Sequence, residues 1–202
     1  RMSHNAVFEC QKDKLYAYGG QSFINSKYER GIVTRSANLS HNIKWSDARL
    51  LVPGNTSSCV ESRCLNTRHE LITCKGDMKR ECEFDGKLSS LQYKKKHLLY
   101  TRANTFKEGG RHVQVVDVSK KSSFRTFQQL EFSNYTQKAA NNIYFFIAKE
   151  IRNIIVGIFP AVINKEGAIW CSTSQDGIRW STPISIYKSE VVQRDRISDW
   201  PI

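Results

Sequence analysis

Acidic side chains stand shortly before two predicted strands, where a pair of them could share one site. Glu83 and Asp85 precede an apolar segment, and Asp199 lies two residues before Pro201. Two carboxyl groups that face each other can divide the chemistry: one, with a raised pKa, donates a proton, and the other stays ionised as a base or nucleophile. Asp85, Glu83 and Asp199 are therefore the catalytic candidates. Each carboxylate also has a structural interpretation, because Asp85 can cap the turn at Gly86 and Asp199 can cap a loop.

Basic and amide side chains are candidate ligands for the polar groups of a substrate. Arg102 ends one predicted strand, Arg111 begins the next, and Arg196 lies near the end of the chain. His4 and Asn5 directly precede the first predicted strand. Guanidinium groups hold hydroxyls and carboxylates through charge-assisted hydrogen bonds. We name these five residues as substrate-binding candidates, although arginines at strand ends are commonly solvated and His4 and Asn5 are equally well explained as loop residues.

The chain holds six cysteines, four of them between residues 53 and 84. Two disulfides would staple a loop that has little core of its own, whereas a tetrahedral zinc site would use the same thiols. Zinc sites usually show two close Cys-x-x-Cys pairs, so the wider spacing here favours disulfides and an oxidising compartment. The four residues are Cys59, Cys64, Cys74 and Cys82. The other two, Cys10 and Cys171, fall in predicted strands, where we expect buried thiols. We expect no cofactor.

The stretch Ala168–Tyr187 has the pattern of a complete β-hairpin. An apolar run is followed by a polar turn and then by a second, alternating strand. In the turn, Asp176 can accept hydrogen bonds from backbone N–H groups of its own loop, and Gly177 can adopt a positive φ. Trp180 can fold back over the turn as an apolar lid. The pattern Ser174-x-Asp-Gly-x-x-Trp resembles the Asp-box hairpin of β-propeller proteins.

The same order of features occurs three times along the chain. Residues 31–52 and 111–132 each read as a strand, a polar turn, an aromatic anchor and a second strand, with Trp45 and Phe127 in the place of Trp180. Two further strand-like runs precede each copy, and four strands make one blade of a propeller. We therefore predict an all-β, single-domain propeller over the whole chain. Its blade units are 4–52, 85–132 and 142–189, a Cys-rich insertion covers 53–84, and a further blade begins within 190–202.

The second unit carries the resemblance that bears on function. Glu83 and Asp85 precede its innermost strand, Arg102 ends the next strand and Arg111 begins the third. This arrangement resembles the five-bladed propellers of the glycoside-hydrolase class, the invertase-like and arabinanase-like enzymes. Such enzymes place two carboxyl groups across the glycosidic bond. Because the innermost strands of different blades converge on the propeller axis, the resemblance implies that Asp85 and Asp199 meet there.

The first unit departs from that family pattern, because His4 and Asn5 stand where those enzymes place an acidic residue. We therefore expect a carbohydrate-recognising or structural propeller of a secreted, cell-surface or virion assembly, with a glycan as its ligand. An active glycoside hydrolase with paired carboxylates on the propeller axis is the alternative interpretation.

The net charge of +12 raises a further alternative, a basic scaffold module that binds an acidic protein or a nucleic acid. The lysines and arginines are spread among predicted loops, with short clusters only at 94–96 and 120–121. The sequence shows no recognition helix, zinc-finger spacing or aromatic RNA-binding strand motif, so nucleic acid is the less favoured partner. No run approaches the roughly 20 apolar residues of a membrane span.

The chain is short for a closed ring of five blades. Five units of about 50 to 60 residues need roughly 250 to 300 residues, whereas this chain has 202. An open ring leaves edge strands exposed. Three interpretations stay open: a fragment of a longer propeller, a propeller completed by other protein chains, and an open arc packed against a partner.

Overall fold

The computed structural model describes most of the strand-forming part of the chain. All regular structure in the described ranges is β-strand, which confirms the all-β prediction. Among these residues no helix is long and apolar enough to cross a membrane. The described ranges are 6–24, 27–39, 42–53, 64–65, 71–72, 87–106, 109–119, 127–138 and 141–188.

Three antiparallel blades follow one another along the chain. Blade 1 consists of β1 (Val7–Gln11), β2 (Lys14–Ile24), β3 (Lys27–Asn38) and β4 (Arg49–Pro53). Blade 2 consists of β7 (Ser89–Tyr93), β8 (Lys96–Phe106), β9 (Gly109–Asp117) and β10 (Gln128–Gln129). Blade 3 consists of β13 (Ile147–Ile151), β14 (Ile154–Ile163), β15 (Glu166–Ser174) and β17 (Ile184–Lys188).

Short strands connect blades 2 and 3 into one hydrogen-bonded sheet. β12 (Asn142–Ile143) pairs in parallel with β9 and antiparallel with β14. β11 (Glu131–Phe132) pairs in parallel with β16 (Arg179–Trp180). β5 (Cys64–Leu65) and β6 (Leu71–Ile72) form a separate two-stranded sheet. No backbone pairing joins blade 1 to blade 2 among the described strands, so side chains hold these two blades together.

The first hairpin of each blade has the same register. A two-residue turn closes each one, and its first residue has a positive φ: 53° at Lys12, 53° at Lys94 and 50° at Arg152. Such turns match the right-handed twist of paired strands. Positions at equal distance from the turn therefore point to equivalent faces of the three blades. The pairs beside the turns are Gln11 with Lys14, Tyr93 with Lys96 and Ile151 with Ile154.

A first hydrophobic core lies between blades 1 and 2. Blade 1 contributes Tyr18, Ile32 and Val52, and blade 2 contributes Leu99 and Val116. Ile32, Val52 and Leu99 are completely buried. Each such aliphatic side chain stabilises the folded state by about 1.5–3 kcal/mol relative to an exposed one.

A second core lies on the opposite face of blade 2, against blade 3. Leu98 and Tyr100 of blade 2 pack with Phe146, Phe159 and Trp180. The Phe146 and Trp180 rings meet edge to face, with centroids 4.9 Å apart, a favoured geometry for aromatic pairs. Blade 2 is therefore covered on both faces.

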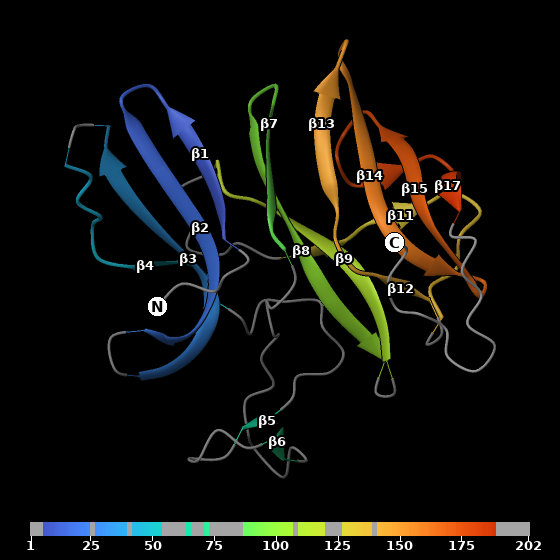
Figure 1. Ribbon diagram of the computed structural model, residues 1–202, viewed down its shortest axis with the longest axis horizontal. Helices are drawn as coiled ribbons and strands as arrows, with labels where there is room; N and C mark the ends of the chain where they lie inside the picture. Colours follow the sequence, from blue (N-terminus) through green and yellow to red (C-terminus); the bar gives the residue numbers. More distant parts are fainter. Residues whose placement is uncertain are drawn as a thin grey trace.

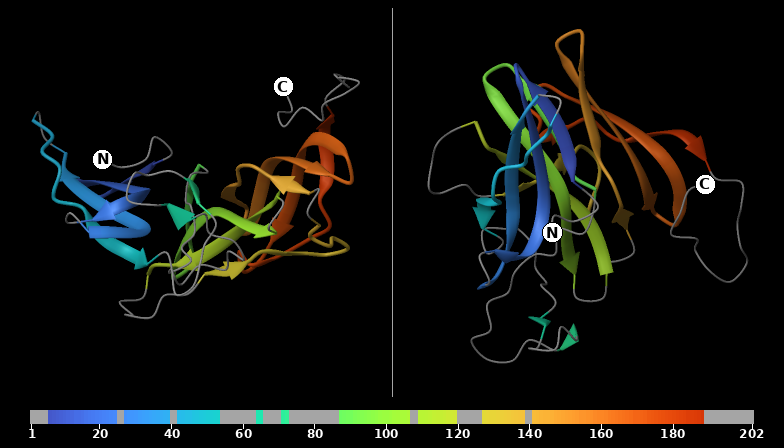
Figure 2. Two further views of the ribbon diagram at one scale, coloured as in Figure 1. Left: turned by 90° about the horizontal axis from the view of Figure 1, so that it is seen from below. Right: turned by 60° about the vertical axis from the view of Figure 1, so that its left-hand side comes forward.

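The three blades stand side by side in chain order, with blade 1 in blue, blade 2 in green and blade 3 in orange (Figure 1). Seen from below, they follow an open arc (Figure 2). The first strand of blade 2, β7, contacts both β1 and β13. The first strands of all three blades thus lie next to one another and run in the same direction (Figure 1).

The three predicted aromatic anchors differ in their surroundings. Phe127 is 6 % exposed and Trp180 is 2 % exposed, so both are core residues. Trp45 is 37 % exposed, and its ring centroid lies 6.1 Å from that of Phe8, which is also exposed. The anchor of the first unit therefore lies on the surface and not in a core.

Candidate functional site

One carboxylate organises the turn between β15 and β16. Asp176 Oδ1 accepts hydrogen bonds from the backbone N–H groups of Ile178 and Arg179, both at 2.8 Å, and Arg179 Nε lies 3.2 Å from Asp176 Oδ2. Partial burial acts to raise the pKa of Asp176, but these backbone hydrogen bonds hold it below its usual value. The predicted use of Asp176 within its own loop is confirmed.

The rest of this turn also has the predicted geometry. Ser174 Oγ accepts the backbone N–H of Gly177 at 2.9 Å and donates to the carbonyl of Arg179 at 2.6 Å. Gly177 has a φ of 82°, and Trp180 is buried in the core between blades 2 and 3. The side chains of Ser174 and Asp176 thus form hydrogen bonds within the turn, as expected of a structural role. The similarity of this hairpin to the Asp-box hairpin concerns its sequence pattern alone.

Most of the predicted site residues lie outside the described residues. They are the catalytic candidates Glu83, Asp85 and Asp199, the substrate-binding candidates His4, Asn5 and Arg196, and the cysteines Cys59, Cys74 and Cys82. Of Cys64, only its place in β5 is described. The pairing of Asp85 with Asp199, the choice between disulfides and zinc, and the Cys-rich insertion stay predictions.

Arg102 and Arg111 are the predicted site residues that the structure does describe. Strand register places both on the face of blade 2 that is turned toward blade 3. Arg111 Nη1 donates to Asn142 Oδ1 and to the Tyr144 hydroxyl, both at 3.3 Å, and its guanidinium lies 5.0 Å from the centroid of the Tyr144 ring. Arg111 thus connects β9 to the segment that leads into β13. A role for either arginine in substrate binding stays a prediction.

Cys10 and Cys171 both carry free thiols, but Cys10 is exposed, so the prediction that it is buried is wrong. The physical reason is its place on β1. Cys10 shares a face with Phe8, and that face points away from blade 2. Within the described ranges, no group of three or more His, Cys, Asp and Glu side chains could hold a metal ion.

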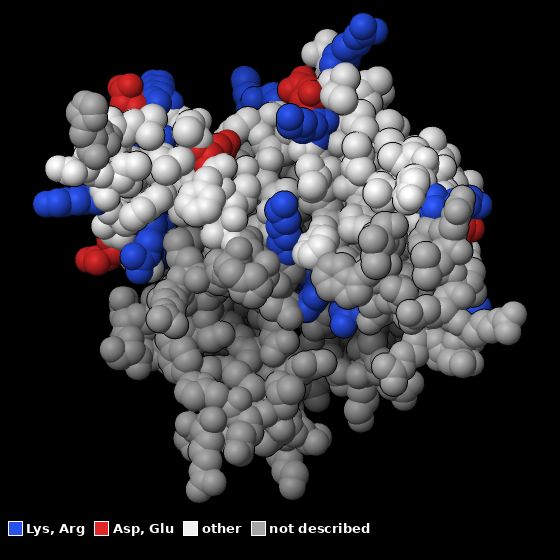
Figure 3. Space-filling view, in the orientation of Figure 1, with Lys and Arg blue, Asp and Glu red and all other residues white. Residues whose placement is uncertain are grey.

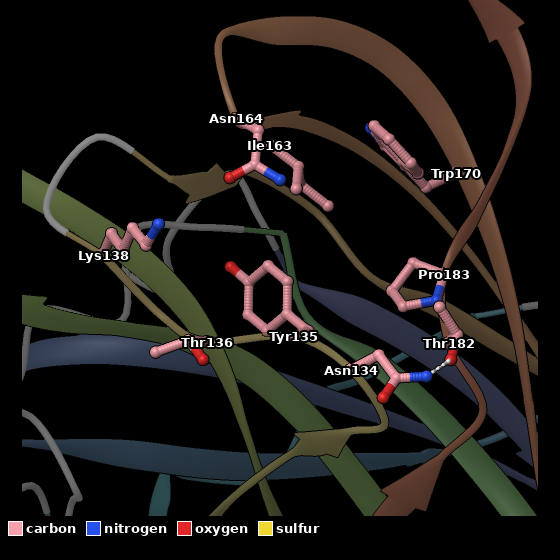
Figure 4. Close-up of a pocket in the computed structure, with 9 residues that line it drawn as sticks. All are labelled: Asn134, Tyr135, Thr136, Lys138, Ile163, Asn164, Trp170, Thr182 and Pro183. Carbon is pink, nitrogen blue, oxygen red and sulfur yellow. Dashed lines mark hydrogen bonds between the residues drawn. The ribbon is translucent and has the colours of Figure 1, made fainter.

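A cavity of about 330 Å³ beside the turn between β14 and β15 is the candidate ligand site (Figure 4). Its size falls in the range of small-molecule sites, roughly 300–1,000 Å³. Three separate parts of the chain line it: the segment after β11, the β14–β15 region and the segment before β17. The lining residues are Asn134, Tyr135, Thr136, Lys138, Ile163, Asn164, Trp170, Thr182 and Pro183.

Two fixed aromatic rings border this cavity. Trp170 Nε1 donates to the carbonyl of Ala161 at 3.2 Å, and the Tyr135 hydroxyl donates to the side-chain oxygen of Gln137. The Tyr135 ring also stacks on the ring of His112, with an interplanar angle of 18°. Burial raises the pKa of Tyr135 to about 12, so the phenol stays protonated at neutral pH. Both rings are held in place before any ligand arrives.

Hydrogen bonds from side-chain amides connect the segments that line the cavity. Asn134 Nδ2 donates to Thr182 Oγ1 at 3.1 Å at one side of the cavity (Figure 4). The buried Asn141 lies next to the lining residues. Its Nδ2 donates to the Thr136 carbonyl at 3.2 Å, and its Oδ1 accepts a hydrogen bond from the backbone N–H of Asn164 at 3.0 Å. The shape of the cavity therefore depends on hydrogen bonds between segments far apart in the sequence.

The composition of the lining is suited to binding. It offers two aromatic rings, amide and hydroxyl groups, and the ammonium of Lys138, whereas the lining residues that the structure describes include no carboxylate and no imidazole. Sequence reasoning missed this site because its residues come from three separate parts of the chain and form no local motif. The signal that could have pointed to it is Trp170, a large aromatic residue in a strand that is only half-buried.

Charge on the visible described surface is mixed. Lysine and arginine side chains lie singly or in small groups among white residues, with a few acidic side chains between them (Figure 3). On this face the described residues form no continuous basic patch, which gives no support to nucleic-acid binding.

Comparison with known proteins identifies the fold. A scan against protein-family models found no match, and neither did a search of curated proteins. Among solved structures, a family 32 β-fructofuranosidase from Bombyx mori matches 91 % of this chain with a TM-score of 0.52 and 14 % identity. Glycoside hydrolases from Bacteroides ovatus and Parabacteroides distasonis each match 93 % with a TM-score of 0.50, at 9 % and 10 % identity.

The chain spans only part of these proteins: 34 % of the Bombyx mori enzyme, 52 % of the Bacteroides ovatus protein and 54 % of the Parabacteroides distasonis protein. At such low identity the similarity identifies the fold alone. The predicted glycoside-hydrolase-like propeller is confirmed, whereas the number of blades in a complete ring stays a prediction. The chain adopts the β-propeller fold that is found in glycoside hydrolases.

Proposed function

We propose that the chain is a carbohydrate-recognising propeller module and that it binds a glycan in the cavity between Tyr135 and Trp170. The observation that carries this proposal is the lining, in which two aromatic rings lie beside amide, hydroxyl and ammonium groups. A sugar ring has apolar C–H faces and a rim of hydroxyls, so both kinds of surface find partners. The names of the similar structures, glycoside hydrolases, support the same ligand class.

Recognition is favoured over hydrolysis at this cavity. Glycoside hydrolysis needs two carboxyl groups on opposite sides of the scissile bond, and there is none among the described residues of the lining. A hydrolytic site would have to be built elsewhere, with Asp85 and Asp199 as its expected pair. Hydrolysis therefore stays the alternative function.

Binding to a glycan panel by the full chain, followed by calorimetric titration of the best ligand, tests this proposal. Trp170→Ala removes one aromatic face and should weaken binding about tenfold or more, the equivalent of a stacking contact. Thr182→Ala removes a hydroxyl from an exposed part of the rim and should weaken binding about threefold, the effect of a modest hydrogen bond. Trp45→Ala is the matched control, because it removes an exposed tryptophan from blade 1.

Two results would contradict the assignment. Unchanged affinity in both cavity variants would remove this cavity from the proposal, since Thr182→Ala does not depend on the packing of Trp170. Glycan turnover that Asp85→Asn abolishes would instead establish a hydrolase whose site is on the propeller axis.

A further inference from the structure

Large exposed apolar side chains occur on the two outer blades and not on blade 2. Contiguous exposed apolar surface on a soluble protein commonly marks an interaction site. Within the described residues, those of blade 1 and the segment after it are Phe8, Leu39, Ile43, Trp45 and Leu50, and those of blade 3 are Ile147, Ile151, Ile154, Ile158, Ile184, Ile186 and Tyr187.

On blade 3 these residues form a row that crosses all four strands. Ile147 pairs with Ile158, Ile158 pairs with Cys171, and Cys171 pairs with Ile184. Residues that are opposite one another on neighbouring strands lie in side-chain contact distance on one face. The outer face of blade 3 therefore carries an apolar row, and the adjacent row on the same face contains Val156 between the exposed Lys149 and Thr173.

The strand at the centre of this surface, β14, is apolar on both faces. Ile155 and Phe159 are fully buried toward blade 2, whereas Ile154 and Ile158 on the opposite face are each 43 % exposed. A strand with one solvated face normally alternates apolar with polar residues, and a strand covered on both faces does not. The composition of β14 is that of a strand covered on both faces.

The shared hairpin register shows what should cover it. Ile158 occupies the position of Tyr18 in blade 1 and of Tyr100 in blade 2. Tyr18 packs against blade 2, with its ring 5.4 Å from that of His97. Tyr100 packs against blade 3, and its hydroxyl donates to the Gly177 carbonyl at 3.2 Å. In both blades this face contacts the next blade, so the outer face of blade 3 is a blade-binding face.

Blade 1 presents the complementary face. Phe8 occupies the position of Ala148 in blade 3, and Ala148 is 3 % exposed because it packs toward the preceding blade. Phe8 itself is 60 % exposed, with Trp45 beside it and Leu50 on the same face of the sheet. Ala17 and Val33, which pair with Phe8 and Leu50 on this face, are buried, so its exposed apolar part among the described residues is limited to Phe8, Leu50 and the neighbouring Trp45. By position, this is the face that corresponds to the one on which a preceding blade packs in blade 3.

We propose that two copies of the chain associate head to tail, with the outer face of blade 3 in each copy packed on the outer face of blade 1 in the other. One second copy covers both exposed faces at once. A closed pair with two-fold symmetry leaves no apolar end free for further growth.

Sedimentation velocity on the full chain up to about 100 μM, well above the Kd of most specific interfaces, measures this association. The expected species has twice the chain mass of 23.3 kDa. Ile158→Lys and Phe8→Lys each place a charge in one of the two faces and should weaken the dimer at least about tenfold. Gln128→Lys adds the same charge at an exposed position of blade 2 and should leave the dimer unchanged. Circular dichroism checks that every variant is folded.

Mixing the two face variants distinguishes a head-to-tail pair from other arrangements. In a pair of one Ile158→Lys copy and one Phe8→Lys copy, both charges fall in the same interface and the other interface is unaltered. The mixture should therefore form more dimer than either variant alone. A Phe8→Lys variant that dimerises like the parent chain would overturn the proposal in favour of blade 3 packed on blade 3. A parent chain that stays monomeric throughout would overturn it.

Discussion

Gly177 combines two restrictions in one residue. Its φ of 82° is unfavourable for residues that carry a Cβ, and an added Cβ would lie 2.8 Å from the Tyr100 hydroxyl and against Leu98. Gly177→Ala should lower the free energy of unfolding by about 2–4 kcal/mol through backbone strain and overpacking. Urea denaturation measures this loss. Gly167→Ala is the matched control, since no atom lies within 4 Å of its added Cβ, and equal losses in the two variants would contradict the explanation.

His112 makes the stability of the second core depend on pH. Burial lowers the pKa of His112, although the Leu130 carbonyl, 2.8 Å from Nε2, opposes that shift. Nδ1 is buried and has no hydrogen-bond partner in the described part of the chain, so protonation would create an unsatisfied donor. A histidine with a lowered folded pKa contributes stability above its unfolded pKa of about 6.5, and this contribution is lost as the pH falls.

The free energy of unfolding should therefore decrease as the pH is lowered below about 6.5. His112 should contribute a decrease of up to about 1.4 kcal/mol for each pH unit. The His112→Gln variant should lose this part of the slope. Chemical denaturation of both proteins between pH 5 and pH 8 provides the comparison. Parallel stability curves would show that His112 does not titrate differently in the folded and unfolded states.

At the scale of elements, β8 supplies both hydrophobic cores from consecutive residues. Leu98 is 1 % exposed and belongs to the core shared with blade 3, whereas Leu99 is fully buried in the core shared with blade 1. Leu98→Ala and Leu99→Ala should each cost about 2–5 kcal/mol through lost burial and the cavity left behind.

Because the same strand serves both cores, each substitution should lower the midpoint of one common unfolding transition. Tryptophan fluorescence and far-ultraviolet circular dichroism, followed on the same samples, test this. If Leu99→Ala separated the two signals into two transitions, blade 1 would be shown to unfold independently.

The elements themselves were largely predictable, because hairpins depend on neighbouring residues. The turn at Asp176 and Gly177 and the burial of Phe127 and Trp180 follow from local alternation and turn chemistry. Trp45 follows the same local pattern, yet it is exposed, because its burial depends on what packs against the outer face of blade 1. Local pattern indicates which side chains share a face and does not indicate what covers that face.

At the scale of the whole molecule, the candidate site was the least predictable part. Tyr135 follows β11, Asn164 lies in the turn between β14 and β15, and Trp170 lies within β15, and no spacing in the sequence links them. They come together because β11 pairs with β16 and β12 pairs with β14, and these contacts between distant segments are absent from any local pattern. The predicted carboxylate site rested on family resemblance, and its residues lie outside the described part of the chain.

The bridging strand β12 determines where the arc can bend. Blades 2 and 3 share a continuous backbone hydrogen-bond network through Asn142, whereas blades 1 and 2 meet through side chains such as Glu9, whose carboxylate lies 3.0 Å from His97. Side-chain contacts slide and re-form at lower cost than a backbone ladder. From the contacts of the described residues, we therefore expect changes in the curvature of the arc to occur mainly between blade 1 and blade 2.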